Sequence, residues 1–307
     1  MDILVTGGAG FIGSNFVHHL IRDTEHRIHV LDLLTYAGDY ANLKPSFHSD
    51  RLSFKNGDIR DESTVKEMMS TADVHVNFAA ESHVDRSIDT AGPFVTTNIG
   101  GTQTLLDIAV DTDIELFIQI STDEVYGEIE YGSFSEGARL GPRNPYAATK
   151  AGADLFAISY HQTYGLPVII TRTSNNFGPR QHREKLIPKL ITRASRGDSL
   201  PIYGDGTNVR EWTYVEDNCR GLNLVLNEGQ VGEVYNIGSG IELTNIEVAT
   251  RIVEAMDVDE SLINFVEDRP GHDQRYSLDS SKIRELGWKP QWSFDEGLVE
   301  TVQFYLN

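Results

Sequence analysis

Tyr146 and Lys150 lie four residues apart in the segment YAATK, beside a stretch predicted to be helical from Ala147 to Tyr164. On a helix, this spacing places both side chains on one face, one turn apart. A nearby ammonium group favours the phenolate and lowers the phenol pKa from its reference value of about 10. Tyr146 is therefore a candidate for taking a proton from a substrate hydroxyl, although an ordinary helix face can show the same pair.

Thr122, Asp123 and Glu124 follow the predicted strand Leu116 to Ser121. Adjacent acids are not informative in this chain, since its 46 acids form six such pairs and random scatter gives roughly seven. The position is informative, because this pair lies at the carboxyl end of a predicted central strand and upstream of Tyr146. Successive side chains leaving a strand diverge, so the two carboxyls can reach different carbons of one substrate.

The glycines of TGGAGFIG lie between the predicted strand Asp2 to Thr6 and a helical pattern from Ser14 to Arg22. Glycines at this spacing allow a tight turn, close approach of a pyrophosphate and close packing of helix on strand. Asp32 ends the next predicted strand, where an acid binds the ribose 2′-hydroxyl and repels the 2′-phosphate of NADP. The combination predicts an NAD site; the competing interpretation is a glycine turn without a ligand.

Two further pairs of residues directly follow predicted strands. They lie at the edge where open parallel sheets bind their ligands. Asp58 and Ile59 follow one strand, and Ala79 and Ala80 follow the next. We expect adenine near Asp58; the alternative role for Asp58 is a cap at a strand-to-helix turn.

The elements that must position these residues alternate along the first half of the chain. Apolar runs predict further strands, and 3.6-residue periodicity predicts the helices between them. The additional strands are Ile28 to Leu31, Leu52 to Phe54, Val74 to Phe78 and Val168 to Thr173, and the additional helices are Val65 to Met69 and Gly101 to Val110. This order predicts an α/β fold, a Rossmann-type doubly wound parallel sheet with helices on both faces.

The second half is less regular and is expected to form a smaller C-terminal substrate-binding lobe. Asn175 to Glu184 and Pro201 to Arg210 are rich in polar and turn residues, which are typical of binding loops. We therefore expect residues 1–174 to form an NAD-binding domain, rejoined by parts of 211–245 because Val234 to Ile237 can add a strand. Residues 175–307 are expected to form mainly a substrate-binding lobe.

Composition narrows the class of partner. The 307 residues suffice for a large core, with 39% hydrophobic and 23% charged residues. A formal charge of −20 repels nucleic acid and anionic membrane surfaces, so neither is an expected partner. The sequence shows no spacing of metal ligands, no transmembrane run and a single cysteine, Cys219, so we expect no metal and a cytoplasmic location. The acid surplus also suits a high-salt cytoplasm.

The glycine motif and the Tyr146–Lys150 pair together resemble the extended short-chain dehydrogenase/reductase superfamily. A closer resemblance to the dTDP-glucose 4,6-dehydratases rests on Asp32 to Gly38 (DLLTYAG), Ala79 to Ser87 (AAESHVDRS), Ser121 to Gly127 (STDEVYG), Ser174 to Pro179 (SNNFGP), Glu184 to Pro188 (EKLIP) and Arg269 to Tyr276 (RPGHDQRY). The chain departs from the family pattern at Arg210-Glu211, where Arg-Asp is expected.

This resemblance implies a reaction in which C4 of glucose is oxidised first, because the C5 proton becomes acidic only beside a ketone. Tyr146 would take the C4 hydroxyl proton as hydride passes to NAD, Lys150 would hold the phenolate and the ribose, and Thr122 would bind the C4 oxygen. Glu124 would remove the C5 proton, Asp123 would protonate the departing C6 hydroxyl, and hydride would return to C6. The residues alone also permit the reverse roles for the two carboxyls.

The resemblance extends to the residues that contact each ligand. The expected NAD contacts are Gly7, Gly10, Phe11, Ile12, Gly13, Asp32, Leu33, Leu34, Thr35, Asp58, Ile59, Ala79, Ala80, Glu81, Thr97, Tyr146, Lys150 and Asn176. The expected substrate contacts are Ser82, His83, Thr122, Asn175, Lys185, Leu186, Pro201, Ile202, Tyr203, Arg210, Asn245, Asp268, Arg269, Pro270, Gly271 and His272. Arg and Lys suit a diphosphate, and an aromatic ring suits a base.

The sequence alone also permits other functions. A UDP-glucose 4,6-dehydratase would need the same groups, whereas a nucleotide-sugar 4-epimerase would not need the acid and base pair Asp123 and Glu124. A catalytically silent NAD-binding scaffold would need none of these groups. The resemblance also implies a homodimer formed through helices such as those at Thr102 to Val110 and Ala147 to Tyr164.

Overall fold

The protein is described by a computed structural model covering residues 1–268 and 271–307. Arg269 and Pro270, two of the expected substrate contacts, therefore lie outside the described residues. Within the described ranges, no helix has the length and apolarity needed to cross a membrane. No cluster of three or more His, Cys, Asp or Glu side chains in these ranges has an arrangement that could hold a metal ion.

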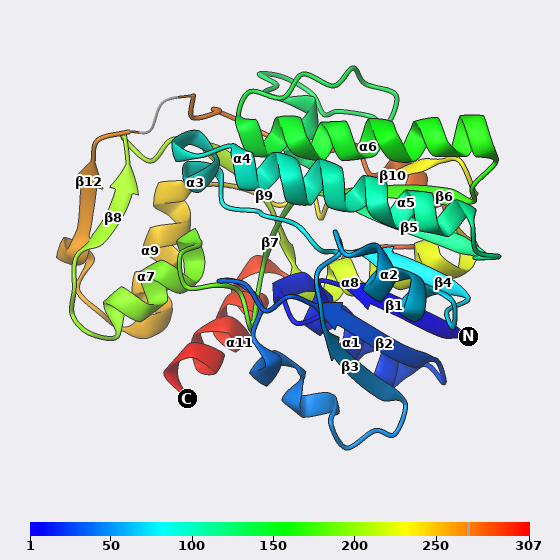
Figure 1. Cartoon of the computed structure of the whole chain (residues 1–307). Helices are drawn as coiled ribbons and strands as arrows, with labels where there is room; N and C mark the ends of the chain where they lie inside the picture. Colours follow the sequence, from blue (N-terminus) through cyan, green and yellow to red (C-terminus); the bar gives the residue numbers. More distant parts are fainter. Residues whose placement is uncertain (269–270) are drawn as a thin grey trace.

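The chain is organised around a seven-stranded parallel sheet with the order β10-β6-β5-β4-β1-β2-β3 (Figure 1). Its strands are β1 (Asp2–Thr6), β2 (Arg27–Asp32), β3 (Leu52–Asn56), β4 (Val74–Asn77), β5 (Leu116–Thr122), β6 (Val168–Thr173) and β10 (Val234–Ile237). The order reverses direction between β1 and β4, and this is the point at which open α/β sheets bind their ligands. The predicted Rossmann-type sheet is confirmed.

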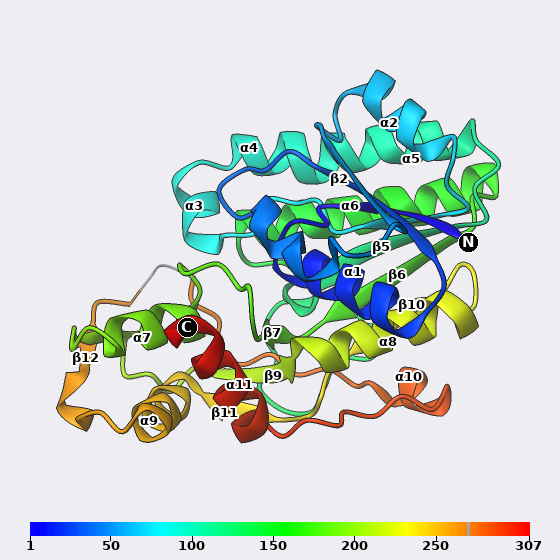
Figure 2. The ribbon, with the colours of Figure 1, turned by 90° about the horizontal axis from the view of Figure 1, so that it is seen from below.

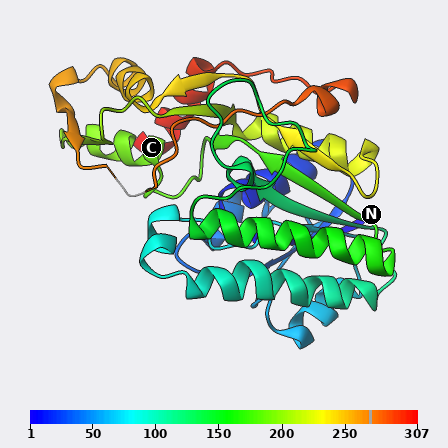
Figure 3. The same cartoon turned by 90° about the horizontal axis from the view of Figure 1, so that it is seen from above.

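Helices cover both faces of the sheet, as the alternating pattern predicted. On one face, α1 (Phe11–Asp23) and α8 (Val215–Glu228) share a core with the sheet. On the other, α2 (Glu62–Met69), α5 (Thr102–Val110) and α6 (Pro145–Tyr164) bury Val65, Leu105 and Ala157. Figure 3 shows α5 and α6 side by side along this face. The central strands read as nearly continuous apolar runs because both of their faces are buried.

Several helices begin earlier than periodicity indicated, because their starts depend on capping rather than on apolar spacing. Asp61 caps α2 by accepting a hydrogen bond of 3.0 Å from the Ser63 N–H. Asn144 caps α6 in the same way, with Pro145 as its first residue. The helix predicted from Gly101 is preceded by α3 (Val84–Asp89), α4 (Gly92–Phe94) and the π-helical η2 (Val95–Gly101).

A second, smaller lobe lies beside the sheet, with its own core (Figure 2). It contains a three-stranded sheet of β7 (Asn175–Phe177), β9 (Val209–Tyr214) and β11 (Glu242–Thr244), and a parallel pair of β8 (Leu200–Tyr203) with β12 (Ile263–Val266). Its helices are α7 (Leu186–Ala194), α9 (Asn245–Met256) and α11 (Phe294–Leu306). Short elements complete the chain: η1 (Tyr40–Ser46), η3 (Asp123–Tyr126), η4 (Glu260–Leu262) and α10 (Ser281–Glu285).

The expectation of irregular binding loops at 175–184 and 201–210 was partly wrong. Both segments contribute strand residues, since β7 lies in the first, and β8 and β9 reach into the second. These strands are stabilised by pairing with segments far away in the chain. Local turn propensity carries no information about such distant partners. Residues 178–184 and the turn between β8 and β9 remain irregular, and Gly204 and Gly206 in that turn have φ of 58° and 74°.

Candidate active site

A cavity of about 620 Å³ lies at the carboxyl ends of the parallel strands, between the sheet and the second lobe. It is lined by residues that follow β1, β2, β3 and β4, by the end of β5, and by residues after β6. It brings together 23 of the predicted residues: Gly7, Gly10, Phe11, Ile12, Gly13, Asp32, Leu33, Thr35, Asp58, Ile59, Ala79, Ala80, Glu81, Ser82, Thr97, Thr122, Asp123, Glu124, Tyr146, Lys150, Asn175, Asn176 and Lys185. The catalytic candidates and the glycine turn thus share one cavity.

The glycine turn is shaped for a close ligand at the N-terminus of α1. Gly7 has a φ of 72°, and a Cβ there would lie 2.5 Å from the Ala79 nitrogen. A Cβ on Gly13 would lie 2.3 Å from the Gly7 carbonyl oxygen. No side chain of the described residues caps α1, and the first N–H groups of a helix lack partners within it. A diphosphate fits this arrangement, because uncapped N–H groups and the helix dipole both favour an anion.

Asp32 is held at the end of β2 by the turn around it. Its carboxylate accepts hydrogen bonds from the Ala9 N–H at 2.9 Å and the Leu34 N–H at 2.8 Å. Burial raises the pKa of Asp32, and these two bonds oppose the rise. A Cβ on Gly38 would lie 2.8 Å from the carboxylate. Leu34 itself does not line the cavity; it packs against the core beneath, with a φ of 56°.

Asp58 lines the cavity beyond β3 and is fixed by Arg60 rather than by a helix. The guanidinium of Arg60 donates from Nε to both oxygens of Asp58 at 3.0 Å. These bonds lower the pKa of Asp58. The carboxylate also accepts the Arg60 N–H at 2.9 Å, so it does close a strand-to-helix turn. The structure therefore supports the alternative role considered for Asp58, at a strand-to-helix turn, while its contact with adenine stays a prediction.

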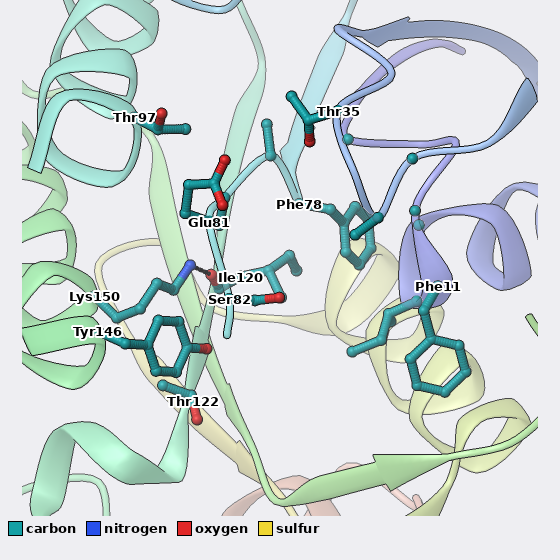
Figure 4. Close-up of a pocket in the computed structure, with 18 of the residues that line it drawn as sticks. Phe11, Thr35, Phe78, Glu81, Ser82, Thr97, Ile120, Thr122, Tyr146 and Lys150 are labelled. Atoms are coloured by element: carbon teal, nitrogen blue, oxygen red, sulfur yellow. Dashed lines mark hydrogen bonds between the residues drawn. The ribbon is translucent and has the colours of Figure 1, made fainter. Parts of the chain in front are cut away.

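Tyr146 and Lys150 project from the first turns of α6 into the cavity (Figure 4). Tyr146 is almost completely buried, and its ring meets that of Phe94 edge to face at 6.4 Å. The Lys150 Nζ donates a hydrogen bond of 2.6 Å to the Ile120 carbonyl oxygen of β5. Helix α6 is thereby tied to the strand that carries Thr122.

The pKa of Tyr146 differs from the expectation that Lys150 would lower it. Burial, with the nearby Glu124 carboxylate as the next cause, raises the pKa of the phenol far above 10. Burial also lowers the pKa of Lys150 to about 8, against the opposing charge of Asp154. In the protein alone, burial and the charge of Glu124 therefore favour the protonated phenol.

The two carboxyls after β5 have different surroundings. Asp123 is 3% exposed, and one of its oxygens accepts the Thr122 hydroxyl at 3.1 Å. Its other oxygen has no hydrogen-bond partner among the described residues. Burial, together with the charges of Glu124 and Glu211, raises the pKa of Asp123 well above its usual value. Glu124 is half-buried and accepts the Asn144 side-chain N–H at 3.0 Å.

The loop after β4 is held in place by Asn98 of η2. Its side-chain oxygen accepts the Glu81 N–H at 2.8 Å, and its amide donates to the Glu81 carbonyl at 3.0 Å and the Thr149 hydroxyl at 2.9 Å. This buried amide joins the loop to α6. Glu81 and Ser82 are consequently positioned opposite Tyr146 and Lys150 in the cavity (Figure 4).

Some of the remaining predicted substrate contacts line the cavity, and the others lie outside it. Lys185 reaches the cavity, and its Nζ donates to the Ser82 carbonyl at 2.8 Å. Arg210 is buried instead, donating to the Asp273 carbonyl at 2.8 Å and lying over the Tyr276 ring at 4.5 Å. The others outside the cavity lining are His83, Leu186, Pro201, Ile202, Tyr203, Asn245, Asp268, Gly271 and His272.

Some of these outlying residues form a second group on the smaller lobe. His272 Nδ1 lies 2.7 Å from an Asp268 carboxylate oxygen, and its ring meets that of Tyr203 edge to face at 6.2 Å. The side chain of Ile202 is buried in the core of the lobe. His83, which could have been a core histidine, is half-buried with its Nε2 3.4 Å from Glu184.

Comparison with known proteins decides the family. A model of the family described as GDP-mannose 4,6 dehydratase matches residues 4–301. The chain belongs to this family. It is 61% identical over 306 residues to the low-salt glycan biosynthesis protein Agl12 of Haloferax volcanii, covering 100% of this chain and 99% of that protein. It is 51% identical over 312 residues to a dTDP-glucose 4,6-dehydratase of an Actinoplanes species, covering 99% and 98%.

Solved structures of similar proteins contain the ligands that the cavity suggests. DesIV, a dTDP-glucose 4,6-dehydratase of Streptomyces venezuelae solved with NAD and dTDP, has a TM-score of 0.98 and 53% identity, covering 100% of this chain and 97% of that one. A UDP-glucuronic acid 4-epimerase of Bacillus cereus, solved with UDP-glucuronic acid and NAD, has a TM-score of 0.95 and 30% identity, covering 100% and 99%. The resemblance to dTDP-glucose 4,6-dehydratases is confirmed.

The cavity is also lined by residues that the sequence analysis did not single out. Gly38 and Arg60 lie in or beside segments already predicted to bind, and Gln181 and His182 lie in the predicted binding loop. These four could have been found by extending each predicted segment. Pro93 and Thr96 carry no such signal, since they reach the cavity only through the helical turns that precede α5.

Replacing Lys150 by methionine should stabilise the fold. A lysine pKa lowered from 10.5 to about 8 corresponds to about 3 kcal/mol of unfavourable burial below pH 8. Between pH 8 and 10.5 the unfolded chain binds a proton that the folded chain does not, so wild-type stability rises with pH in this window. We expect Lys150→Met to raise the free energy of unfolding at pH 7 by about 1–3 kcal/mol, measured by denaturant titration.

The gain should shrink as the pH rises from 8 through 10.5, because above this range the lysine is neutral in both states. Lys66→Met, at an exposed position on α2, is the matched control and should change stability little. A variant no more stable than the wild type at pH 7 would contradict the cost assigned to burying this ammonium.

Proposed function

We propose that this chain is an NAD-dependent dTDP-glucose 4,6-dehydratase, forming dTDP-4-keto-6-deoxyglucose. The observation that carries the proposal is the presence of two unlike carboxyls, Asp123 and Glu124, in one cavity with Tyr146 and the glycine turn. An oxidation at C4 needs only the phenol and the cofactor, whereas elimination across C5 and C6 also needs a base and an acid. The dTDP-glucose 4,6-dehydratases among its relatives support the same substrate.

The first step falls to Tyr146, Lys150 and Thr122. Bound NAD supplies the hydride acceptor for C4 and the hydride donor for C6. Tyr146 takes the C4 hydroxyl proton, and the Thr122 hydroxyl orients the C4 oxygen. Lys150, already anchored to Ile120, stabilises the phenolate form of Tyr146 before it takes this proton. Bound NAD in its oxidised form would favour the same form, because a nearby positive charge opposes the effect of burial on the phenol.

Elimination then uses the two carboxyls in separate roles. Glu124 removes the C5 proton, which has become acidic beside the C4 ketone, and a proton returns to C5 once C6 has been reduced. Asp123 donates a proton to the departing C6 hydroxyl, a role supported by the burial that raises its pKa. Two neighbouring carboxyls can divide these tasks because their environments favour different protonation states.

The parts of the fold divide between the two ligands. Residues 1–174, with parts of 211–245, hold NAD through the glycine turn, Asp32 and the loop after β4. Residues 175–307 mainly bind the nucleotide sugar, with Asn175 and Lys185 at its diphosphate, since both line the cavity. A buried free thiol at Cys219 fits a reducing compartment, so the cytoplasm is the proposed location.

Incubation with dTDP-glucose tests the function. We expect a 4-keto-6-deoxy sugar to form with no net consumption of NAD, and dTDP-glucose to react faster than UDP-glucose. Mass spectrometry distinguishes the product, because elimination lowers its mass by one water. A product that keeps its C6 hydroxyl and is inverted at C4 would instead identify an epimerase, and faster reaction of UDP-glucose would identify the uracil-specific dehydratase.

We also propose a homodimer formed through α5 and α6. Leu155, Phe156 and Ile158 of α6 are exposed apolar side chains on the outer face of this helix pair, and burying them in a partner is favourable. Sedimentation should give twice the chain mass of 34.2 kDa for the wild type and a monomer for Leu155→Glu. Phe265→Glu, at an exposed position on β12, should remain dimeric; a monomeric wild type would rule out this interface.

A further inference from the structure

One side-chain amide at the start of α6 contacts the carboxylate of Glu124. The Nδ2 of Asn144 donates to Glu124 at 3.0 Å, and its Oδ1 accepts the Ala147 N–H at 2.8 Å as the helix cap. The side chain is buried, at 8% exposure. The amide cannot be reversed without losing both bonds, because its oxygen has no proton to donate and its nitrogen cannot accept.

The two bonds connect groups that act in different steps of the reaction. Asn144 immediately precedes Pro145 and Tyr146, so the amide that begins the helix of the phenol also holds the carboxylate. Asp123 accepts its hydrogen bond from the hydroxyl of its chain neighbour Thr122, and not from an amide on a separate element. The two adjacent carboxyls are thus distinguished by a contact from a separate element of the fold.

We propose that Asn144 is a positioning residue that makes Glu124, and not Asp123, the base of the elimination step. A hydrogen-bond donor aimed at a carboxylate favours its ionised form and fixes its direction. Asp123, without an equivalent donor and almost completely buried, keeps its proton and serves as the acid. This inference rests on the proposed function, because it assigns roles within that reaction.

Among the described residues, no ionisable group around the pair donates a hydrogen bond to Glu124, although the charge of Glu211 adds to the burial that raises the pKa of Asp123. The groups that face the pair are Tyr146 on α6, Tyr276 in the segment before α10, and Arg210 and Glu211 on β9. The Arg210 guanidinium is already committed to the carbonyls of Val209 and Asp273. The Tyr276 hydroxyl donates to Asp273. Asn144 therefore provides the contact that separates the two carboxyls.

Two variants separate the positioning role from capping. Asn144→Asp and Asn144→Ser both retain a side-chain oxygen that caps a helix well, but both lack the amide donor. With dTDP-glucose in heavy water, we measure C5 deuterium exchange and, in single turnovers, C4 oxidation. We expect C5 exchange to fall by about ten- to a hundredfold, as for a lost hydrogen bond to a charged group, while C4 oxidation is nearly unchanged.

The aspartate variant adds a readout that capping does not influence. It places a second carboxylate beside Glu124, and like charges at hydrogen-bond distance disfavour ionisation of both. The acid limb of the pH profile for C5 exchange should therefore move to higher pH in Asn144→Asp and not in Asn144→Ser. Ser293→Asp, which exchanges the cap of α11, is the control and should match the wild type.

The outcomes decide between the possibilities. A folded variant at position 144 that exchanges C5 at the wild-type rate would overturn the positioning role. Equal losses of C4 oxidation and C5 exchange would also overturn it, since they indicate general disruption. If the aspartate variant does not fold, the serine variant alone decides. A wild-type chain that neither exchanges C5 nor eliminates water would refute the proposed function itself, and the inference with it.

Discussion

Tyr146→Phe is expected to lower kcat for formation of the 4-keto-6-deoxy sugar by about 10²–10⁴-fold, the range for losing a positioned acid or base. The substitution removes only the hydroxyl. The ring keeps its place against Phe94, so folding and NAD binding should persist.

Product formation measured by mass spectrometry, together with the NAD content of the purified variant, checks this expectation. Tyr164→Phe serves as the control, since Tyr164 lies on the same helix with an exposed side chain, and it should retain wild-type activity. A Tyr146→Phe variant within fivefold of the wild type would exclude the phenol as the group that takes the C4 hydroxyl proton.

Gly13→Ala is expected to weaken NAD binding by at least about 100-fold and to lower stability by about 1–3 kcal/mol. The added Cβ would lie 2.3 Å from the Gly7 carbonyl oxygen and 2.9 Å from the Gly8 Cα. Both atoms belong to backbone, so no flexible side chain can move aside. The turn must open, and the N–H groups at the start of α1 then lose the alignment that suits a diphosphate.

Calorimetric titration with NAD and thermal unfolding measure the two effects. Gly137→Ala is the matched control, because a Cβ there meets nothing within 4 Å, and it should bind NAD like the wild type. If Gly13→Ala binds NAD with unchanged affinity, the glycine turn is not the diphosphate site.

Local patterns in the chain were sufficient to predict the sheet, the glycine turn and the residues at the strand ends. Strands β1, β5 and β6 are buried on both faces, so they appear as apolar runs that need no knowledge of their neighbours. Gly7, Asp32 and Asp123 are found from the same runs, because each lies where a strand stops. The type of each side chain and the order of the strands along the chain can both be read directly from the sequence.

The remaining features of the site and the fold depend on contacts between segments that are distant in the sequence. Burial, which depends on all surrounding elements, raises the phenol pKa in the chain without ligands, whereas the Tyr146–Lys150 spacing alone predicted a lower one. Strands β8 and β9 were missed, since their partners lie far along the chain. The difference between Asp123 and Glu124 also arises in three dimensions, where Asn144 approaches from 20 residues away. Desolvation and long-range hydrogen bonds depend on which atoms meet, and only folding brings those atoms together.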